Sequence, residues 1–175
     1  RSLQDGLRQG RFELALTYDL NLAADIEFEP VVTVPLYAAV PSDHRLAKRS
    51  SVRLAELEGE PLVLLGLPDS RDHFLSIFAE AGIEPAIAYE TRSFEMVRGL
   101  VANGYGYSIL HSRAPHHQAL DGSALECIPL VEPHREIHMG IARLANSRST
   151  RMGLAVAQIC REHLPDLLEE QAEGD

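Results

Sequence analysis

The segment from Ser93 to Leu110 constrains the fold more than any other part of this 175-residue chain. Its first half carries apolar residues at the spacing of a helix, namely Phe94, Val97, Leu100 and Val101. Ser93 is a common helix N-cap, and Asn103-Gly104 supplies a left-handed stop. The apolar residues from Tyr105 to Leu110 then predict a short buried strand. Because a helix N-terminus that follows a strand attracts anions and polar ligands, the segment also indicates where a ligand binds.

Strands and helices alternate on the N-terminal side of this segment. An apolar strand is expected at Pro61–Leu65, and a helix with an apolar face follows it and ends at Gly82. A further strand is expected at Ala86–Tyr89, directly before Ser93. Strands that alternate with helices in this way are parallel and are joined by crossover helices. The sequence therefore predicts an α/β fold.

The two ends of the chain follow a different pattern. Phe12 to Thr17 predicts a strand, and the Val- and Pro-rich stretch from Phe28 to Pro41 suits an extended segment that travels between lobes. Arg135 to Arg143 alternates as a strand does, and the capping cluster at Asn146–Thr150 precedes a last helix. A chain of this length suits one domain or two small lobes.

Composition limits the partners of the chain. Its 26 acidic and 16 basic residues give a formal net charge of −10, so we do not expect this segment to bind nucleic acid by itself. No apolar run approaches the roughly 18 residues of a membrane span, and the first residues resemble the middle of a helix rather than a signal peptide. Cys127 and Cys160 lack a CxxC spacing. We therefore expect two thiols in a cytoplasmic protein, with a disulfide or redox pair as the alternative.

Four segments, taken in order, resemble the effector-binding domain of LysR-type transcriptional regulators. Leu7-Arg8-Gln9-Gly10-Arg11-Phe12-Glu13-Leu14-Ala15-Leu16 is similar to the family's Leu-x-x-Gly-x-Leu-Asp-Leu-Ala-Ile. Pro35–Pro41, followed by His44-Arg45-Leu46-Ala47, is similar to the stretch that leads to the family's His-Pro-Leu-Ala. The residues from Leu100 to Leu110 resemble Val-x-x-Gly-x-Gly-Ile-x-x-Leu-Pro, and Arg135 to His163 resembles the final strand and helix. Departures from the family pattern are Glu13 for Asp, Arg45 for Pro and His111 for Pro.

The resemblance implies a two-lobed α/β fold like that of type 2 periplasmic binding proteins, with two crossing strands between the lobes. Residues 1–34 and 136–175 are expected to form lobe one, and residues 35–135 lobe two. The family's N-terminal winged helix-turn-helix is absent from this sequence, as is roughly the first strand, helix and second strand of the effector domain. Lobe one is therefore expected to be incomplete.

The resemblance also implies a function. A small molecule, such as a small organic acid, is expected to bind between the lobes and to shift the conformation of a homo-oligomer, a dimer or tetramer. DNA would be bound only through the absent N-terminal domain. The alternatives are a free-standing solute-binding protein of the same fold and an enzyme.

Loops that follow parallel strands supply the candidate ligand contacts, because strand ends face the cleft in such lobes. Thr91 and Ser93 offer hydroxyl and N–H groups, although Ser93 would cap a helix in any case. Arg92 suits an anionic ligand, an exposed or ion-paired arginine being the alternative. The full set of expected ligand contacts is Thr17, Tyr18, Thr91, Arg92, Ser93, Phe94 and His111.

Metal and catalytic sites are not expected, and neither is a cofactor. The histidines form two groups in the sequence, His111 with His116 and His117, and His134 with His138. Neither group has the spacing of several converging zinc ligands. Gly104-Tyr105-Gly106-Tyr107-Ser108 lacks the glycine that follows the serine of a nucleophile elbow, so its glycines indicate a turn. The chain contains no GxGxxG, Walker or HExxH motif.

Overall fold

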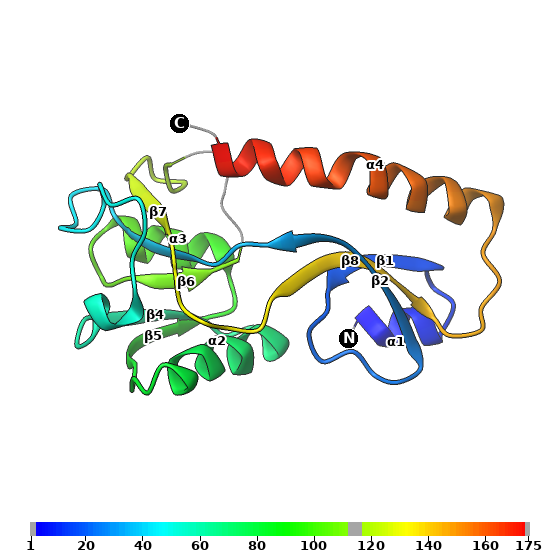
Figure 1. Ribbon diagram of the computed structural model, residues 1–175, viewed down its shortest axis with the longest axis horizontal. Coiled ribbons are helices and arrows are strands. Elements are labelled where there is room, and N and C mark those ends of the chain that lie inside the picture. The colour runs from blue at the N-terminus through cyan, green and yellow to red at the C-terminus, as the bar shows by residue number, and fades with distance from the viewer. Residues whose placement is uncertain (1–2, 112–116, 174–175) are drawn as a thin grey trace. The chain divides into compact units, whose positions relative to one another are not determined.

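The computed structural model describes residues 3–111 and 117–173 (Figure 1). These residues belong to two compact units of the chain. Unit 1 consists of Arg1–Val34 and Glu136–Asp175, and unit 2 consists of Pro35–Arg135. Within the described ranges, no helix is both long enough and apolar enough to cross a membrane.

Unit 1 is a three-stranded antiparallel sheet with two helices (Figure 1). Its elements are α1 (Leu3–Arg8), β1 (Leu14–Tyr18), β2 (Ile26–Val34), β8 (Ile137–Leu144) and α4 (Arg151–Glu173). The central strand is β8, which pairs with β1 on one side and with β2 on the other. A small core forms between α1 and the sheet from Leu7, Ala15, Ile26 and Ala142. The long helix α4 packs on β2, where Arg161 reaches Glu29.

Unit 2 holds the larger core and the parallel strands. Its strands are β3 (Tyr37–Pro41), β4 (Pro61–Leu65), β5 (Ala86–Thr91), β6 (Ser108–Leu110) and β7 (Leu125–Pro129), and its helices are η1 (Leu54–Leu57), α2 (Pro68–Glu80) and α3 (Phe94–Ala102). Strands β4 and β5 are parallel, which confirms the predicted crossover through α2. Strand β3 pairs antiparallel with β6 and with β7. Tyr107 joins the two sets, because it forms a parallel bridge with Leu62 of β4.

The core of unit 2 explains why these segments take these structures. All five residues of β3 are buried, and β4 is buried from Leu62 to Leu65. Helices cover the strands with apolar stripes at helical spacing: Phe74, Ile77 and Phe78 on α2, and Val97 and Val101 on α3. Each large side chain buried in this way contributes about 1.5–3 kcal/mol. The apolar stripes, rather than helix propensity, therefore hold α2 and α3 against the sheet.

The segment from Ser93 to Leu110 folds largely as the sequence predicts. Ser93 caps α3 by accepting a hydrogen bond from the N–H of Met96 at 3.3 Å. Gly104 follows the helix with a φ of 77°, as the left-handed stop requires. The predicted strand is too long, however, because β6 begins at Ser108 rather than at Tyr105. Tyr105 is 51% exposed, and Gly106 has a φ of 146°, so the chain turns here before it enters the core.

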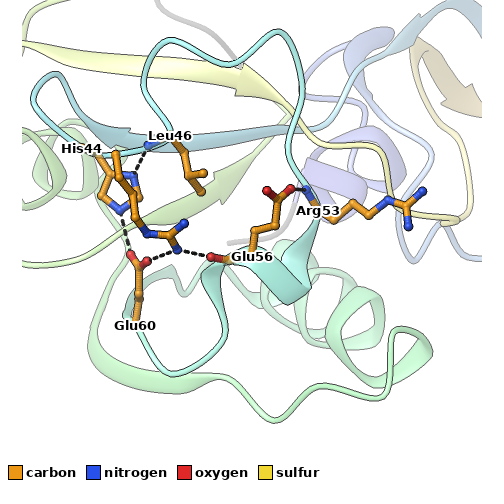
Figure 2. A network of polar contacts seen from close by, with 6 residues as sticks. His44, Leu46, Arg53, Glu56 and Glu60 are labelled. Carbon is orange, nitrogen blue, oxygen red and sulfur yellow. Dashed lines mark hydrogen bonds and ion pairs between the residues drawn. The ribbon is translucent and has the colours of Figure 1, made fainter.

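A polar network links the turn after β3 with η1 and with Glu60, the residue before β4 (Figure 2). Nε2 of His44 lies 2.8 Å from Oε2 of Glu60, and Nδ1 of His44 accepts a hydrogen bond from the N–H of Leu46 at 3.3 Å. Because Nδ1 accepts, the proton of a neutral His44 sits on Nε2 and is donated to Glu60. Arg45 takes the place of the usual proline and donates to Glu60 at 2.7 Å and to the carbonyl of Glu56.

The carboxylate of Glu60 also affects the pKa of the buried phenol of Tyr107. Burial, followed by the negative charge of Glu60, raises the pKa of Tyr107 far above its ordinary value. Tyr107 is only 3% exposed and forms the bridge to β4, so the charge of Glu60 acts on the residue that joins the two sets of strands in unit 2.

Candidate functional site

The parallel strands β4 and β5 end at one edge of unit 2. Leu65 and Thr91, the last residues of these strands, are partners in the register, and the N–H of Gly66 donates to the carbonyl of Thr91 at 2.8 Å. Helix α2 starts three residues after Leu65, at Pro68, and α3 starts at Phe94, three residues after Thr91. Two helices therefore begin beside each other at this edge, each with the positive end of its dipole toward it.

Thr91 and Ser93 build the start of α3. The hydroxyl oxygen of Thr91 accepts from the N–H of Ser93 at 3.2 Å, and that of Ser93 accepts from the N–H of Met96. Both side chains thus have the structural role that sequence reasoning gave as the alternative for Ser93. Each hydroxyl still has its own hydrogen to donate. Ser93 and Arg92 are exposed, and Thr91 is half-buried.

Phe94 contacts both the main core and a buried arginine of α3. It is half-buried against the main core, and the guanidinium of Arg98 lies 5.8 Å from its ring centroid. Arg98 is only 3% exposed, donates to the carbonyl of Gln118 at 2.5 Å and lies 3.6 Å from Glu95. Sequence reasoning missed Arg98, because its helical position lies within the apolar stripe but its charge is typical of an exposed residue. Arg98 therefore links α3 to the chain at Gln118, and the Phe94 ring lies beside its guanidinium.

The first turns of α2 form the other half of this edge. Its N-cap residue, Leu67, provides no side-chain hydrogen bond to the helix, in contrast to Ser93 on α3. Arg71, one turn into α2, donates from Nε to Oε1 of Glu90 on β5 at 3.2 Å. Arg71 was not predicted as a site residue. The signal for it was its position in the first turns of a helix that follows a parallel strand.

His111 stands where β6 ends and is held by Pro35, between β2 and β3, and by His73 of α2. Its Nδ1 lies 3.1 Å from the carbonyl of Pro35, and its Nε2 lies 2.7 Å from Nε2 of His73 on α2. Phe74 stacks on its ring, with centroids 5.7 Å apart. The ring of His134 lies 6.2 Å from that of His111. Helix α2 therefore contacts β5 through Arg71, and it contacts the predicted site residue His111 through His73.

Two of the remaining histidines contact acidic side chains. His117 lies 3.1 Å from Glu126, and His116 lies outside the described residues. His138 contacts Asp19 in unit 1, whereas His134 belongs to unit 2. In the ranges that the structure describes, no group of three or more His, Cys, Asp or Glu side chains is arranged to hold a metal ion. Both cysteines, Cys127 and Cys160, are thiols.

The expected loop position of Thr17 and Tyr18, after a parallel strand, is wrong, and their role as ligand contacts stays a prediction. Both residues lie inside β1, an antiparallel strand, where they pair with Gly140 and Met139 of β8. The strand extends this far because β8 continues beside it. Thr17 and Tyr18 belong to unit 1, and the other five predicted contacts belong to unit 2.

A shallow depression of about 250 Å³ lies in unit 1, at the start of α4. Its lining residues are Glu13, Leu14, Thr150, Met152, Gly153 and Val156. None of the predicted ligand contacts lines it.

Comparisons with known proteins agree on one family. The family described as LysR substrate binding domain matches residues 1–165. The uncharacterized HTH-type transcriptional regulator YybE of Bacillus subtilis (strain 168) is 32% identical over 141 residues, which are 80% of this chain and 47% of YybE. The crystal structure of HinK, a LysR family transcriptional regulator from Pseudomonas aeruginosa, is 37% identical in sequence, with a TM-score of 0.88. The match covers 94% of this chain and 57% of the HinK chain.

A more distant structure shares the fold. The effector binding domain of QuiR, in complex with shikimate, is 24% identical with a TM-score of 0.77 over 92% of this chain and 78% of that domain. The expected α/β fold of the type 2 periplasmic-binding-protein kind is thus confirmed. The chain spans about half the length of YybE and of HinK. Together with the family match over residues 1–165, these similarities show that the chain belongs to the LysR substrate-binding domain family, the effector-binding part of LysR-type transcriptional regulators.

Proposed function

We propose that this domain senses a small organic acid for a bacterial transcriptional regulator, and that the acid binds at the strand-end edge of unit 2. The observation that carries the proposal is the pair of helix N-termini at that edge, which follow β4 and β5 directly. Backbone N–H groups and the helix dipoles favour a carboxylate there. The hydroxyls of Thr91 and Ser93 and the guanidinium of Arg92 add donors of the same kind.

The chemistry of a relative supports this ligand class. The QuiR domain, which shares the fold, is in complex with shikimate. Membership of a family of regulator domains favours this function over that of an enzyme or of a free-standing solute-binding protein. Binding between two lobes, formed by units 1 and 2, stays a prediction from the family resemblance. The expected lobe boundaries are also predictions from that resemblance.

DNA contact is proposed to reside outside this segment. The net charge of −10 disfavours phosphate binding, whereas relatives such as YybE are described as HTH-type regulators. Ligand binding would favour one arrangement of the oligomer over another and so change how its DNA-binding parts are presented. A protein with this role works in the cytoplasm, which we also propose.

A homo-oligomer, a dimer or tetramer, is proposed from the surface of α4. This helix exposes several large apolar side chains, namely Met152, Leu154, Val156, Ile159 and Leu167. Met152, Val156 and Ile159 recur at helical spacing and share one face, and exposed apolar patches often mark protein contacts. Sedimentation equilibrium checks the proposal: the double variant Met152→Glu, Ile159→Glu should shift the protein to a smaller species. An unchanged mass distribution would remove this surface from the contact.

The ligand site is tested by a thermal-shift screen of small carboxylic acids, followed by calorimetry with the acids that stabilise the protein. The double variant Thr91→Ala, Ser93→Ala should bind such an acid at least about tenfold more weakly. It also loses the cap of α3, so its melting temperature should fall. Thr150→Ala is the matched control, because Thr150 caps α4 in unit 1. Unchanged affinity in the double variant would remove Thr91 and Ser93 from the site.

A further inference from the structure

The structure brings three imidazoles together that are far apart in the chain. His73 lies on α2, His111 at the end of β6 and His134 after β7. The ring centroids of His73 and His111 are 4.9 Å apart, and those of His111 and His134 are 6.2 Å apart. All three side chains are half-buried, so solutes reach them while their positions are constrained. All three residues belong to unit 2.

Backbone carbonyls set the protonation of two of these rings. Nδ1 of His111 faces the carbonyl of Pro35 at 3.1 Å, and Nδ1 of His134 faces the carbonyl of Glu132 at 2.7 Å. Because a carbonyl only accepts, we assign the proton of each neutral ring to Nδ1. Nε2 of each ring then carries a lone pair. Histidines that bind metals are commonly held in this way, with the second ring nitrogen donating to a carbonyl or carboxylate.

The contact between His73 and His111 is the second observation. Their Nε2 atoms lie 2.7 Å apart, so a single proton between them is shared in a hydrogen bond. Two nitrogens bound to one tetrahedral zinc ion at about 2.0–2.1 Å lie about 3.3 Å from each other. Chelation therefore needs the two nitrogens to separate by about 0.6 Å and each half-buried ring to tilt, so that both lone pairs point at one ion. His73 then carries its ring proton on Nδ1, as His111 already does.

From this geometry, we propose that His73 and His111 bind a borderline transition-metal ion, Zn²⁺ or Ni²⁺, through their Nε2 atoms. Imidazole nitrogens select such ions over Mg²⁺ and Ca²⁺, which prefer oxygen ligands. The described residues contain no ready group of three ligating side chains, so the pair leaves coordination positions open. Water fills these positions. The inference does not depend on the effector proposal, because metal binding is measured without an effector.

The experiment uses the whole protein with its affinity tag removed and its metals stripped with a chelator that is then dialysed away. Zn²⁺ is titrated by calorimetry, and Co²⁺ serves as a spectroscopic probe, because its visible absorption reports nitrogen ligation. We expect one ion per chain, a rise in melting temperature with Zn²⁺, and an affinity at least about tenfold lower in both His73→Gln and His111→Gln.

His163→Gln is the matched control, since His163 is an exposed histidine on α4 in unit 1. It should bind Zn²⁺ as the unaltered protein does. The double variant His73→Gln, His111→Gln, checked for folding by circular dichroism, separates the remaining outcomes. Binding that persists in this variant would overturn the proposal, because the ion would then sit on other histidines. Absence of Zn²⁺ binding to the unaltered protein would overturn it as well.

Discussion

Glu13, just before β1, accepts two hydrogen bonds from Thr150, the residue before α4, although 137 positions separate them. Oε1 of Glu13 accepts from the N–H of Thr150 at 2.6 Å, and Oε2 accepts from its hydroxyl at 2.7 Å. The Thr150 hydroxyl in turn accepts from the N–H of Gly153 at 3.1 Å. Glu13 therefore orients the residue that caps α4. The carboxylate that the family usually supplies as Asp is present here on a longer side chain.

Thr150→Ala removes this cap and leaves the Glu13 carboxylate without its hydroxyl partner. We expect a loss of about 1 kcal/mol in the free energy of unfolding, measured by urea denaturation. Thr150→Ser keeps the hydroxyl and should stay close to the unaltered protein. If Thr150→Ala and Thr150→Ser unfold at the same urea concentration, the hydroxyl does not contribute to the cap.

His44 is predicted to stabilise the turn after β3 through both of its ring nitrogens. His44→Phe keeps the shape of the ring but leaves the N–H of Leu46 and one oxygen of Glu60 without their partner. The side chains of His44 and Glu60 are only 16% and 27% exposed, so we expect a loss of about 1–3 kcal/mol. The comparison is Arg45→Ala, which removes a 57% exposed partner of Glu60 and should cost less than about 1 kcal/mol. Urea denaturation ranks the two variants, and the reverse order would contradict this account.

Local signals predicted the elements whose ends depend on local chemistry. The cap at Ser93 and the stop at Gly104 act within one turn of their own helix, so the sequence around α3 determines them. Strand β4 was predicted at its observed bounds, because a continuous apolar run flanked by polar and glycine residues is typical of a buried parallel strand.

Contacts between distant segments were not predictable in the same way. The pairing of Thr17 and Tyr18 depends on how far β8 continues beside β1, which no local pattern of β1 records. His73 and His111 meet because α2 follows β4 and β6 lies beside β4 through Tyr107. The sequence places His111 near His116 and His117, whereas the sheet order places it near His73. Of the candidate site, sequence reasoning therefore found the strand ends but not the partners on α2.

Acid should weaken the attachment of α4 to β2. Hydrogen bonds from Arg161 lower the pKa of Glu29 below its ordinary value of 4.5, and partial burial opposes this effect. A lowered pKa in the folded state means that the pair stabilises the protein above about pH 4.5 and that this contribution is lost as the pH falls through the lowered value. Arg161→Gln should therefore lower the melting temperature at neutral pH, with a difference from the unaltered protein that shrinks below about pH 4.

Arg148→Gln is the control for this pH series, because Arg148 is an exposed arginine just before α4. It should melt with the unaltered protein across the whole series. A difference between Arg161→Gln and the unaltered protein that stayed constant into acid would show that the Glu29 carboxylate is not the partner that matters.

Three glycines in and after α3 should respond to alanine in three different ways. Gly99 lies inside the helix with open space around it, so Gly99→Ala should stabilise the protein by about 0.5–1 kcal/mol. Gly104 also has open space but a φ of 77°, so Gly104→Ala should cost about 1–2 kcal/mol. At Gly106 the φ is 146°, and an added Cβ would lie 2.1 Å from the carbonyl oxygen of Pro61.

Gly106→Ala should therefore be the most damaging of the three substitutions. The Pro61 carbonyl accepts a hydrogen bond from the N–H of Tyr107 at 3.0 Å, so it has no room to retreat without breaking the link between β4 and β6. We expect a cost of at least about 3 kcal/mol by urea denaturation. Equal stability of Gly104→Ala and Gly106→Ala would show that backbone conformation alone, and not the Pro61 carbonyl, requires glycine at this turn.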